Sequence, residues 1–541
     1  MSPSRRGTSR FPFFLIYGSL AFALSAALLP FQYFIGHDGV WYARIGVNIL
    51  AGKGIAVNPG EPYPDHPPLY PFLVGLANLF FKDPEFSGHF ISILAFSLSL
   101  VPFFLLARLI YPGKTAHWAS LLYATNGFLL VHSNMVLAES LFIFIALFQI
   151  FLTHRIIQDE SPSFGNSLLL GFVAGAAFLT RPEALLFYGA SVFSLLILSS
   201  ASFGVRFARV LASLSIFLLL SLPWIFFVHR QTHRWQLSGA VTEIFVKRQM
   251  DVVNSEKYLE VKKIYQGLTE DKTRLKMDEL KENFRFLDGL RKDRWALLRS
   301  GAVAALWHFL DLNRYLFGGL GFFFIGAGFF HEPWDSRRKK SETLLLLFFA
   351  TVVPQFFGIF HPKRWFLYFP ILLLWMGKGV AVASERASQS FSGIRKNSEA
   401  LALGLCLFFV LPSAAYVHHC FSASPVPREY QEMGLWMKEN LPHIEKERVA
   451  SRHPSIIFYS GAKILNPPYL PYVDRLDDLL VYLKHQRARY FVIPSDLDSP
   501  TLDSYRDLLD ETKKLPEGIR RVHTIEGKVK VALFEAVAGP E

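Results

Sequence analysis

The sequence predicts a mainly helical, polytopic membrane protein of about eleven spans, followed by a small α/β domain. Three observations predict this architecture. Hydrophobic residues make up 51% of the 541 residues and charged residues only 18%, whereas soluble domains carry about 25% charged residues. Apolar runs recur from the N-terminus to about residue 418. After Phe421 the composition changes to polar residues mixed with short β-like stretches.

Each apolar run is close to the length that crosses a bilayer. A helix needs about 20 residues, with a range of about 17–25, to span a hydrocarbon core about 30 Å thick. The first run is about 25 residues long, beyond the 7–15 of a signal-peptide core, so we expect an uncleaved helix there. The runs cover residues 11–35, 89–110, 116–131, 135–153, 166–180, 184–200, 208–228, 314–330, 343–360, 365–383 and 399–418.

Lysine and arginine residues predict which side of the membrane each connection faces. With the N-terminus in the cytoplasm, the short cytoplasmic connections carry the basic residues, as the positive-inside bias requires. The outer side then receives the first loop, 36–88, the long loop 229–313 and the C-terminal tail. The basic residues of the inner side are Lys114, Arg155, Arg206, Arg209, Arg337, Arg338, Lys339, Lys340, Lys378, Arg386, Arg395 and Lys396.

Two domains are expected, a membrane domain over residues 1–421 and an α/β domain outside the membrane over 422–541. In the tail, "RVASRH", "RYFVIP" and "KVKVALFEA" predict strands. "SPVPREYQEMGLWMKENLP" predicts a linker and an amphipathic helix, and "RLDDLLVYLKHQR" a second helix. The role of this domain stays open between acceptor binding, gating of a cavity and stabilisation of the outer face.

Composition and missing motifs argue against several functions. The net charge of +12 is not concentrated in a compact basic domain, so nucleic acid is not an expected partner. Cys406 and Cys420 cannot build a disulfide framework. The sequence lacks the phosphate loop, the His-Glu-x-x-His zinc motif and the dinucleotide fingerprint. These absences argue against an ATP-driven pump, a zinc protease and an oxidoreductase, and no nucleotide cofactor is expected.

Ionisable residues gather where the apolar runs reach the outer side. Asp38 follows the first run, and Glu139 lies inside the apolar stretch "NMVLAESLF". A charge within the membrane is costly unless it is paired or faces a wet cavity, so such residues are functional candidates. We therefore predict a polar cavity on the outer face. The further members of the group are Arg181 and Glu183 in "LTRPEALL", His361, Lys363 and Arg364 in "FHPKRWFLYFP", and Asp65 and His66 in "PYPDHPPLYP".

Every member of this group also has a purely structural interpretation. Asp38 could cap the following helix, because Asp-Gly pairs favour turns and aspartate is a good N-cap residue. Glu139 could belong to a structural ion pair, and Arg181 could pair with Glu183 at the tip of their hairpin. The basic residues of "HPKRW" could anchor to lipid headgroups, and "HPPLYP" could only stiffen its loop.

Taken in order, these motifs resemble those of the polytopic GT-C glycosyltransferases. The motifs are an early Asp followed by "YARIGVNILAGKG", then "HPPLYPFLVGL", "AES", "LTRPE" and "HPKRWFLYFP". Over residues 11–385 the chain is similar to the protein O-mannosyltransferases and to the bacterial aminoarabinose and galacturonic-acid transferases of lipid A. The resemblance implies two amphipathic helices within 40–85. It also implies an enzyme of the bacterial inner membrane that moves a sugar from a polyprenyl-phosphate carrier to a lipid, glycan or protein acceptor on the outer face.

The resemblance also implies roles for single residues. Asp38 matches the first-loop acidic residue, the catalytic base or acceptor-positioning group. Glu139 matches the second acidic residue, which in some members helps to hold a divalent metal ion, so Asp38 and Glu139 are the candidate metal ligands. His66 stands where the aminoarabinose transferases usually have Lys, which weakens the case for that sugar. The candidates for the donor phosphate are Arg181, His361, Lys363 and Arg364, and those for the rest of the substrate are Tyr42, Asp65, His66 and Glu183.

The chemistry of glycosyl transfer fits these residue types. A base near the acceptor hydroxyl contributes about 10²–10⁴-fold, and cations stabilise the charge that grows on the leaving phosphate. A single displacement at the sugar would invert the anomeric centre. Two alternatives stay open. One is a transporter or flippase, although such proteins more often show paired halves with interrupted helices. The other is a polysaccharide polymerase or ligase, for which 229–313 would be the large outer loop.

Overall fold

The computed structural model describes most of the membrane domain and most of the C-terminal domain. The described residues are 13–31, 34–159, 164–239, 294–315, 319–356, 362–390, 397–423, 427–465, 470, 476–497 and 505–537.

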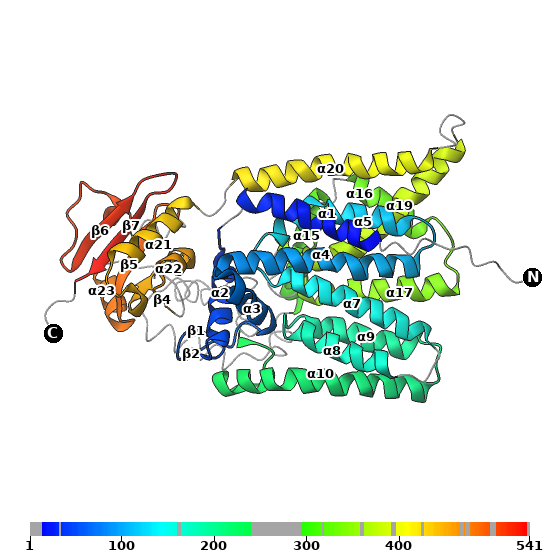
Figure 1. Ribbon diagram of the computed structural model, residues 1–541, viewed down its shortest axis with the longest axis horizontal. Helices are drawn as coiled ribbons and strands as arrows, with labels where there is room; N and C mark the ends of the chain where they lie inside the picture. Colours follow the sequence, from blue (N-terminus) through cyan, green and yellow to red (C-terminus); the bar gives the residue numbers. More distant parts are fainter. Residues whose placement is uncertain are drawn as a thin grey trace, which may run out of the picture.

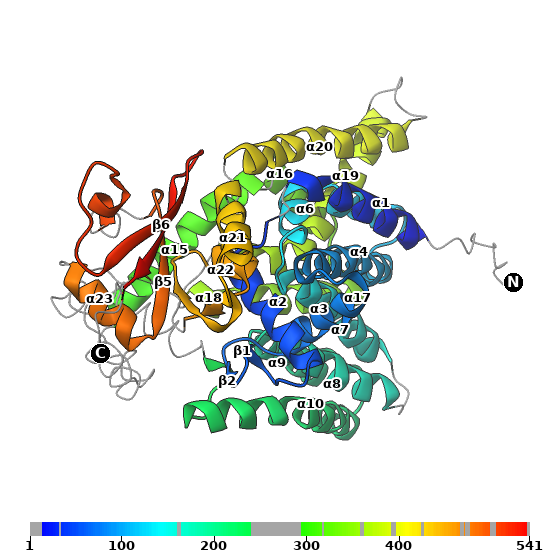
Figure 2. The ribbon, with the colours of Figure 1, turned by 60° about the vertical axis from the view of Figure 1, so that its left-hand side comes forward.

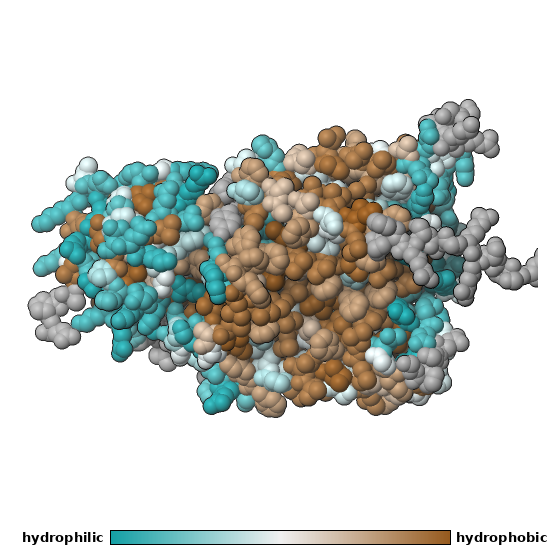
Figure 3. Space-filling view, in the orientation of Figure 1, coloured by the Kyte–Doolittle hydropathy of each residue, from teal (hydrophilic) through white to brown (hydrophobic). Residues whose placement is uncertain are grey.

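A bundle of apolar helices forms the larger part of the molecule (Figure 1). Hydrophobic side chains cover the flank of this bundle, whereas polar side chains cover the C-terminal domain and the opposite end (Figure 3). Among the described residues, five helices are long and apolar enough to cross a membrane. They are α1 (Phe13–Leu28, extended by η1, Leu29–Phe31), α4 (Pro84–Ile110), α7 (Glu139–Gln158), α10 (Phe203–Thr232) and α20 (Ser398–Ala423).

Shorter elements complete the bundle. Every predicted apolar run contains a helix, but the number that cross the membrane stays a prediction, because many of these helices are short. The run 116–131 is divided into two helices. The first ends at Ala124, and Asn126 is the N-cap of the second, where its side chain accepts a hydrogen bond from the backbone N–H of Leu129. The shorter elements are α5 (Thr115–Ala124), α6 (Gly127–Ser133), α8 (Gly165–Phe178), α9 (Ala184–Leu198), α15 (Arg294–Tyr315), α16 (Gly319–Phe330), α17 (Ser336–Ala350), α18 (Val353–Phe356), η2 (Pro362–Leu367) and α19 (Phe369–Ser390).

Two helices of the first loop lie across the end of the bundle beside the C-terminal domain (Figure 1). They are α2 (His37–Leu50) and α3 (Leu69–Phe81), joined through the hairpin of β1 (Ala56–Asn58) and β2 (Glu61–Pro62). The two helices cross closely at Gly46 and Gly75. A Cβ atom on Gly46 would lie only 2.3 Å from the backbone oxygen of Pro71. This crossing fixes α2, and with it Asp38, against α3.

The C-terminal domain contains a mixed five-stranded sheet in the order β4-β3-β5-β7-β6. β3 is parallel to both β4 and β5, whereas β7 is antiparallel to β5 and β6. The strands predicted in "RVASRH", "RYFVIP" and "KVKVALFEA" are β3, β5 and β7, and both predicted helices are present. The elements are α21 (Arg428–Asn440), η3 (Ile444–Lys446), β3 (Arg448–Ala450), α22 (Pro454–Ser460), β4 (Lys463–Ile464), α23 (Leu476–His485), β5 (Ala488–Pro494), β6 (Ile519–Ile525) and β7 (Val531–Ala536).

The C-terminal domain contacts the bundle through α22, which lies between the sheet and α2 (Figure 2). The Arg44 guanidinium of α2 donates to the backbone oxygen of Ile457 at 2.9 Å. The Ser455 hydroxyl donates to the backbone oxygen of Ile35 at 2.8 Å. Ile35 precedes Asp38 by three residues, so the domain holds the segment that leads into the N-terminus of α2.

Candidate active site

Asp38 lies in the first turn of α2. Gly36 is the N-cap residue of this helix, and no side chain caps it, so the interpretation of Asp38 as the helix cap is wrong. The carboxylate is 38% exposed, and its Oδ1 atom lies 3.7 Å from Nδ1 of His37. The positive end of the helix dipole favours a carboxylate in the first turn. Asp38 is therefore an accessible carboxylate in the first turn of α2.

Arg181 lies between two carboxylates at the tip that connects α8 and α9. Its Nη1 atom is 2.6 Å from Oε1 of Glu139, and its Nη2 atom is 3.1 Å from Oε1 of Glu183. Glu139 is the first residue of α7, and Glu183 is the N-cap residue of α9. The pairing of Arg181 with Glu183 was expected as one interpretation of the sequence, whereas the shorter contact with Glu139 was not predicted. Both structural ion pairs are therefore present.

This arrangement fixes the guanidinium group but leaves part of it unused. A guanidinium has five N–H donors in a planar fork. The Nε atom of Arg181 is buried and has no hydrogen-bond partner among the described residues. The side chain as a whole is 14% exposed. Arg181 thus keeps N–H donors for hydrogen bonds to a phosphate group, while Glu139 and Glu183 hold its orientation.

The charges of Asp38, Glu139 and Arg181 all act on the phenol of Tyr42. The pKa of its phenol is raised well above the usual range, first by burial and then by the negative charge of Glu139, with Arg181 opposing and Asp38 adding to the rise. Glu139 and Arg181 are in direct contact, and the negative charge of Asp38 acts on the same phenol. The convergence of all three residues on one site stays a prediction. Tyr42 stays neutral and can donate a hydrogen bond.

His66 and Asp65 pack around the same region. The His66 ring is edge-on to that of Tyr42, with centroids 4.8 Å apart, and stacks on Tyr63 at 5.5 Å. The backbone N–H of Leu69 donates to the oxygen of Leu179 at 2.9 Å, which joins the "HPPLYP" segment to the tip that carries Arg181. Asp65 instead lies against Gly239 in the segment that follows α10, where a Cβ on Gly239 would lie 2.0 Å from its Oδ1 atom.

Three predicted phosphate ligands cannot be placed beside this cluster. His361 lies outside the described residues. The backbones of Lys363 and Arg364 belong to η2, but their side chains lie outside the described part of the chain. Their roles stay predictions.

The predicted metal site is not supported by the described residues. Within them, no group of three or more His, Cys, Asp or Glu side chains could hold a metal ion. Glu139, one of the two candidate ligands, already pairs with the cation of Arg181. A divalent ion usually requires several oxygen ligands. Asp38 and Glu139 alone therefore do not meet the needs of such an ion.

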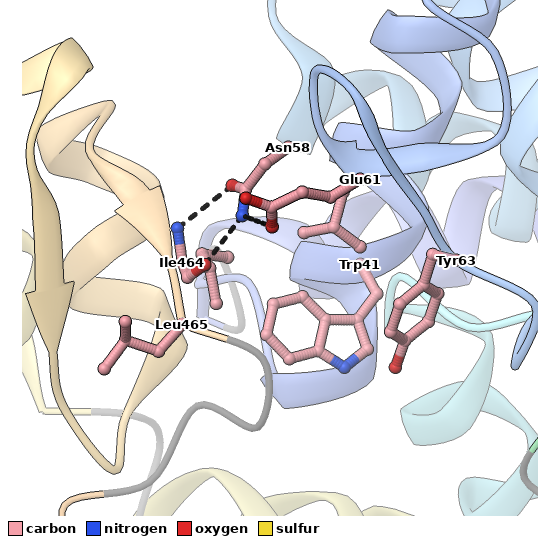
Figure 4. A pocket seen from close by; sticks show the side chains of 7 residues that line it. Trp41, Asn58, Glu61, Tyr63, Ile464 and Leu465 are labelled. Carbon is pink, nitrogen blue, oxygen red and sulfur yellow. Dashed lines mark hydrogen bonds between the residues drawn. The ribbon is translucent and has the colours of Figure 1, made fainter. Parts of the chain in front are cut away.

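Several aromatic and polar residues near the cluster were not predicted. The rings of Trp41 and Tyr63 lie side by side at a small cavity of about 10 Å³ (Figure 4), room for about one water molecule. Its other wall is formed by Ile464 and Leu465 of the C-terminal domain. Asn58 closes the cavity by donating to the Ile464 oxygen at 2.7 Å and accepting from the Ile464 N–H at 3.1 Å. No sequence signal distinguishes these residues from other loop residues.

A second unpredicted contact joins the two domains beside Asp38. The Tyr459 hydroxyl donates to the buried carboxylate of Glu85, the second residue of α4, at 2.8 Å. The same oxygen accepts the backbone N–H of Ile35 at 3.4 Å. Glu85 offered a weak signal, as a carboxylate at the start of an apolar helix, whereas Tyr459 offered none.

Residues 65–226 match the family model described as dolichyl-phosphate-mannose-protein mannosyltransferase. This segment contains His66, Glu139, Arg181 and Glu183. No curated protein matches the chain by sequence.

Solved structures match over nearly the whole chain. ArnT from Cupriavidus metallidurans bound to undecaprenyl phosphate has a TM-score of 0.58 at 12% identity, covering 98% of this chain and 100% of ArnT. The oligosaccharyltransferase AglB from Archaeoglobus fulgidus, in complex with an inhibitory peptide and a dolichol-phosphate, has a TM-score of 0.57 at 14% identity, covering 89% of this chain and 69% of AglB. A structure of the Archaeoglobus fulgidus enzyme with Zn and sulfate has a TM-score of 0.56 at 13% identity, covering 88% and 67%.

The chain has the GT-C fold. The resemblance noted from the sequence is confirmed at this level, since ArnT and AglB are both polytopic glycosyltransferases of the GT-C type. In this fold the helix α2, which carries Asp38, and the start of α7, which carries Glu139, both lie at the end of the bundle that the C-terminal domain covers (Figure 1).

Proposed function

We propose that the protein is an inverting glycosyltransferase that moves a sugar from a polyprenyl-phosphate carrier to an acceptor hydroxyl. The observation that carries this proposal is the buried ion pair of Glu139 with Arg181 near Tyr42, whose pKa the charge of Asp38 also raises. An accessible carboxylate and a partly unused guanidinium are the two groups that the reaction requires. The match of residues 65–226 to the dolichyl-phosphate-mannose-protein mannosyltransferase model and the fold shared with ArnT support the same chemistry.

Asp38 acts as the base in this proposal. It takes the proton from the acceptor hydroxyl while the hydroxyl oxygen attacks the anomeric carbon of the sugar. The bond between that carbon and the carrier phosphate breaks, and its electron pair goes to the phosphate oxygen. Because attack and departure occur on opposite faces, the configuration inverts. The exposure of Asp38 and its place in the first turn of α2 support this role.

Arg181 binds the carrier phosphate, whose charge grows as the bond breaks. Arginine suits this task because its planar fork can bind two phosphate oxygens. Glu139 and Glu183 position the guanidinium, and Tyr42 donates a hydrogen bond to the substrate. Lys363, Arg364 and His361 are proposed as further ligands of the phosphate. Asp65 and His66 shape the substrate side of the site.

We propose that the N-terminus is cytoplasmic and that the cluster and the C-terminal domain face the outside of a bacterial inner membrane. The basic residues at the opposite helix ends support this orientation through the positive-inside bias. The acceptor would be a lipid, a glycan or a protein.

An assay that detects cleavage of the sugar–phosphate bond tests the proposal. Membranes that contain the chain receive a polyprenyl-phosphate sugar labelled in the sugar, and the products are separated into intact carrier and transferred sugar. A glycosyltransferase gives labelled acceptor and sugar-free carrier, with inverted configuration at the anomeric carbon. Movement of the intact donor across the membrane without bond breakage would instead show a flippase and would overturn the proposal. Retained configuration would overturn the inverting mechanism.

A further inference from the structure

A polar cavity of about 250 Å³ lies at the end of the bundle far from Asp38. Helix α7 begins at Glu139 of the candidate active site and reaches this cavity with its last turn. Its 20 residues correspond to about 30 Å. The cavity is therefore separate from the candidate active site. Its lining residues are Leu109, His154, Arg155, Gln158, Asp159, Asn166 and Arg337.

The charge of the lining favours an anion. Arg155 and Arg337 contribute two guanidinium groups, and Asp159 contributes one carboxylate. Both arginines are exposed, so a ligand can reach them. The Arg337 side chain makes one long hydrogen bond, from Nη2 to the Leu109 backbone oxygen at 3.3 Å. Guanidinium groups bind phosphate oxygens in pairs. Two arginines that line one cavity thus suit a ligand with a phosphate group, because each guanidinium can bind two phosphate oxygens.

Two helices begin at the cavity, and one of their N-termini reinforces this preference. Asn166 is the second residue of α8, and Arg337 is the second residue of α17. The N-terminal end of a helix carries a partial positive charge and attracts anions. The Asp335 carboxylate already caps α17 by accepting from the Arg338 N–H, whereas no side chain caps α8. The cavity therefore combines the N-terminus of α8 with two cationic side chains.

A buried histidine gives an independent sign of a ligand. His154 is 2% exposed and lines the cavity. Its Nε2 atom lies 2.9 Å from the hydroxyl of Ser341, which donates to the Arg337 backbone oxygen. The second ring nitrogen, Nδ1, has no hydrogen-bond partner among the described residues. A buried polar atom without a partner costs free energy. A ligand with a hydroxyl group, or a water molecule bound with it, would remove that cost.

We propose that this cavity binds the headgroup of an anionic phospholipid. The phosphodiester lies between Arg155 and Arg337, and the hydroxyl groups of the headgroup face Gln158, Asn166 and His154. The position supports a lipid, because the cavity lies where membrane helices end and where headgroups begin. The bound headgroup contacts the ends of α4, α7, α8 and α17. Because it binds the folded protein and not the unfolded chain, it raises the free energy of unfolding. The inference does not depend on the proposed transferase activity.

Thermal unfolding of the purified full chain in detergent tests this inference. Phosphatidylglycerol should raise the unfolding temperature in a saturable way, whereas phosphatidylcholine and inorganic phosphate should not. The double variant Arg155→Gln/Arg337→Gln should need at least about tenfold more phosphatidylglycerol for the same shift, the loss expected for one charge-assisted hydrogen bond. The variant Lys339→Gln is the matched control, because it removes an exposed charge from the same helix end outside the cavity.

Three results would overturn the inference. The first is an equal response to phosphatidylglycerol and phosphatidylcholine. The second is an equal loss in the double variant and in Lys339→Gln. The third is a full response to inorganic phosphate alone, which would assign the cavity to the free ion. If the double variant does not fold, Arg155→Gln and Arg337→Gln are measured singly, and an unchanged lipid response in both would contradict the proposal.

Discussion

The guanidinium group of Arg181 lies 2.6 Å from the carboxylate of Glu139, and the two side chains are 14% and 3% exposed. The pair joins the first residue of α7 to the tip between α8 and α9. Removal of one partner from such a pair leaves a charge buried without compensation, which costs more than the pair itself contributes.

The first prediction concerns this ion pair. Arg181→Met should lower the free energy of unfolding by about 3–5 kcal/mol, because Glu139 keeps a buried charge. The double variant Glu139→Gln/Arg181→Met should be more stable than Arg181→Met, because the buried charge is gone. Unfolding of the four proteins in detergent gives the double-mutant cycle. Simple additivity of the two single effects would show that the side chains are not coupled.

The second prediction concerns the close crossing of α2 and α3. Gly46→Ala places a methyl group 2.3 Å from the Pro71 oxygen, so the helices must separate. Overpacking of this kind costs about 1–3 kcal/mol, and the shift of α2 should also lower sugar transfer, because α2 carries Asp38. Gly189→Ala in α9 is the control, because its Cβ meets no atom within 4 Å. Equal transfer rates in the two variants would show that the crossing does not position the site.

The third prediction concerns the contact of Tyr459 with Glu85. Tyr459→Phe removes the hydroxyl that donates to this buried carboxylate, which should cost about 1.5–3 kcal/mol. Hydrogen exchange should increase around Ile35 and in α22, where the domain meets the bundle. The same substitution in a Glu85→Gln background should cost less, because a neutral acceptor binds more weakly. An identical cost in both backgrounds would refute the coupling.

The fourth prediction concerns pH and the C-terminal sheet. Burial opposes the charged form of Glu535 on β7, but hydrogen bonds from Arg520 and Arg489 outweigh burial and lower the pKa of this carboxyl below its usual 4.5. A lowered pKa in the folded state stabilises the protein above pH 4.5, and this stabilisation is lost as the pH falls through the folded value.

Glu535→Gln provides the measurement. Its unfolding temperature should lie below that of the unchanged protein at pH 7, and the difference should shrink as the pH falls below 4.5. The control Asp507→Asn removes an exposed carboxylate of the same domain that pairs with Lys513. A difference for Glu535→Gln that stays constant with pH would contradict the assigned cause.

The helices of the bundle could be predicted because length and hydropathy alone determine a membrane helix. Asn126 shows the limit of this signal, since it begins a second helix within one apolar run. β4 and β6 were not predicted. β4 has two residues, and β6 carries Arg520, Arg521 and His523 in place of an alternating apolar pattern. Its strand conformation depends on pairing with β7, a contact that the local sequence does not encode.

The candidate site could be predicted in part for a similar reason. Charged residues are rare in apolar runs, so Glu139 and Arg181 stood out, and membrane topology placed them at one end. The direct pairing of Glu139 with Arg181 depends on how α7 packs against the tip after α8, which spacing does not reveal. Tyr63, Asn58 and Tyr459 lie in polar segments where such residues are common, and only the folded chain brings them to the junction of the two domains.

The rate of sugar transfer by Asp38→Asn tests the central claim most directly. Membranes that contain the chain and its native acceptors receive a labelled polyprenyl-phosphate sugar, and transfer and donor binding are measured together. Transfer should fall by at least about 10²-fold, the contribution of a general base, while donor binding is retained. The control Asp83→Asn also removes a carboxylate, from the N-cap of α4, where asparagine caps equally well, and should transfer at the normal rate. Unchanged transfer by Asp38→Asn would contradict the account.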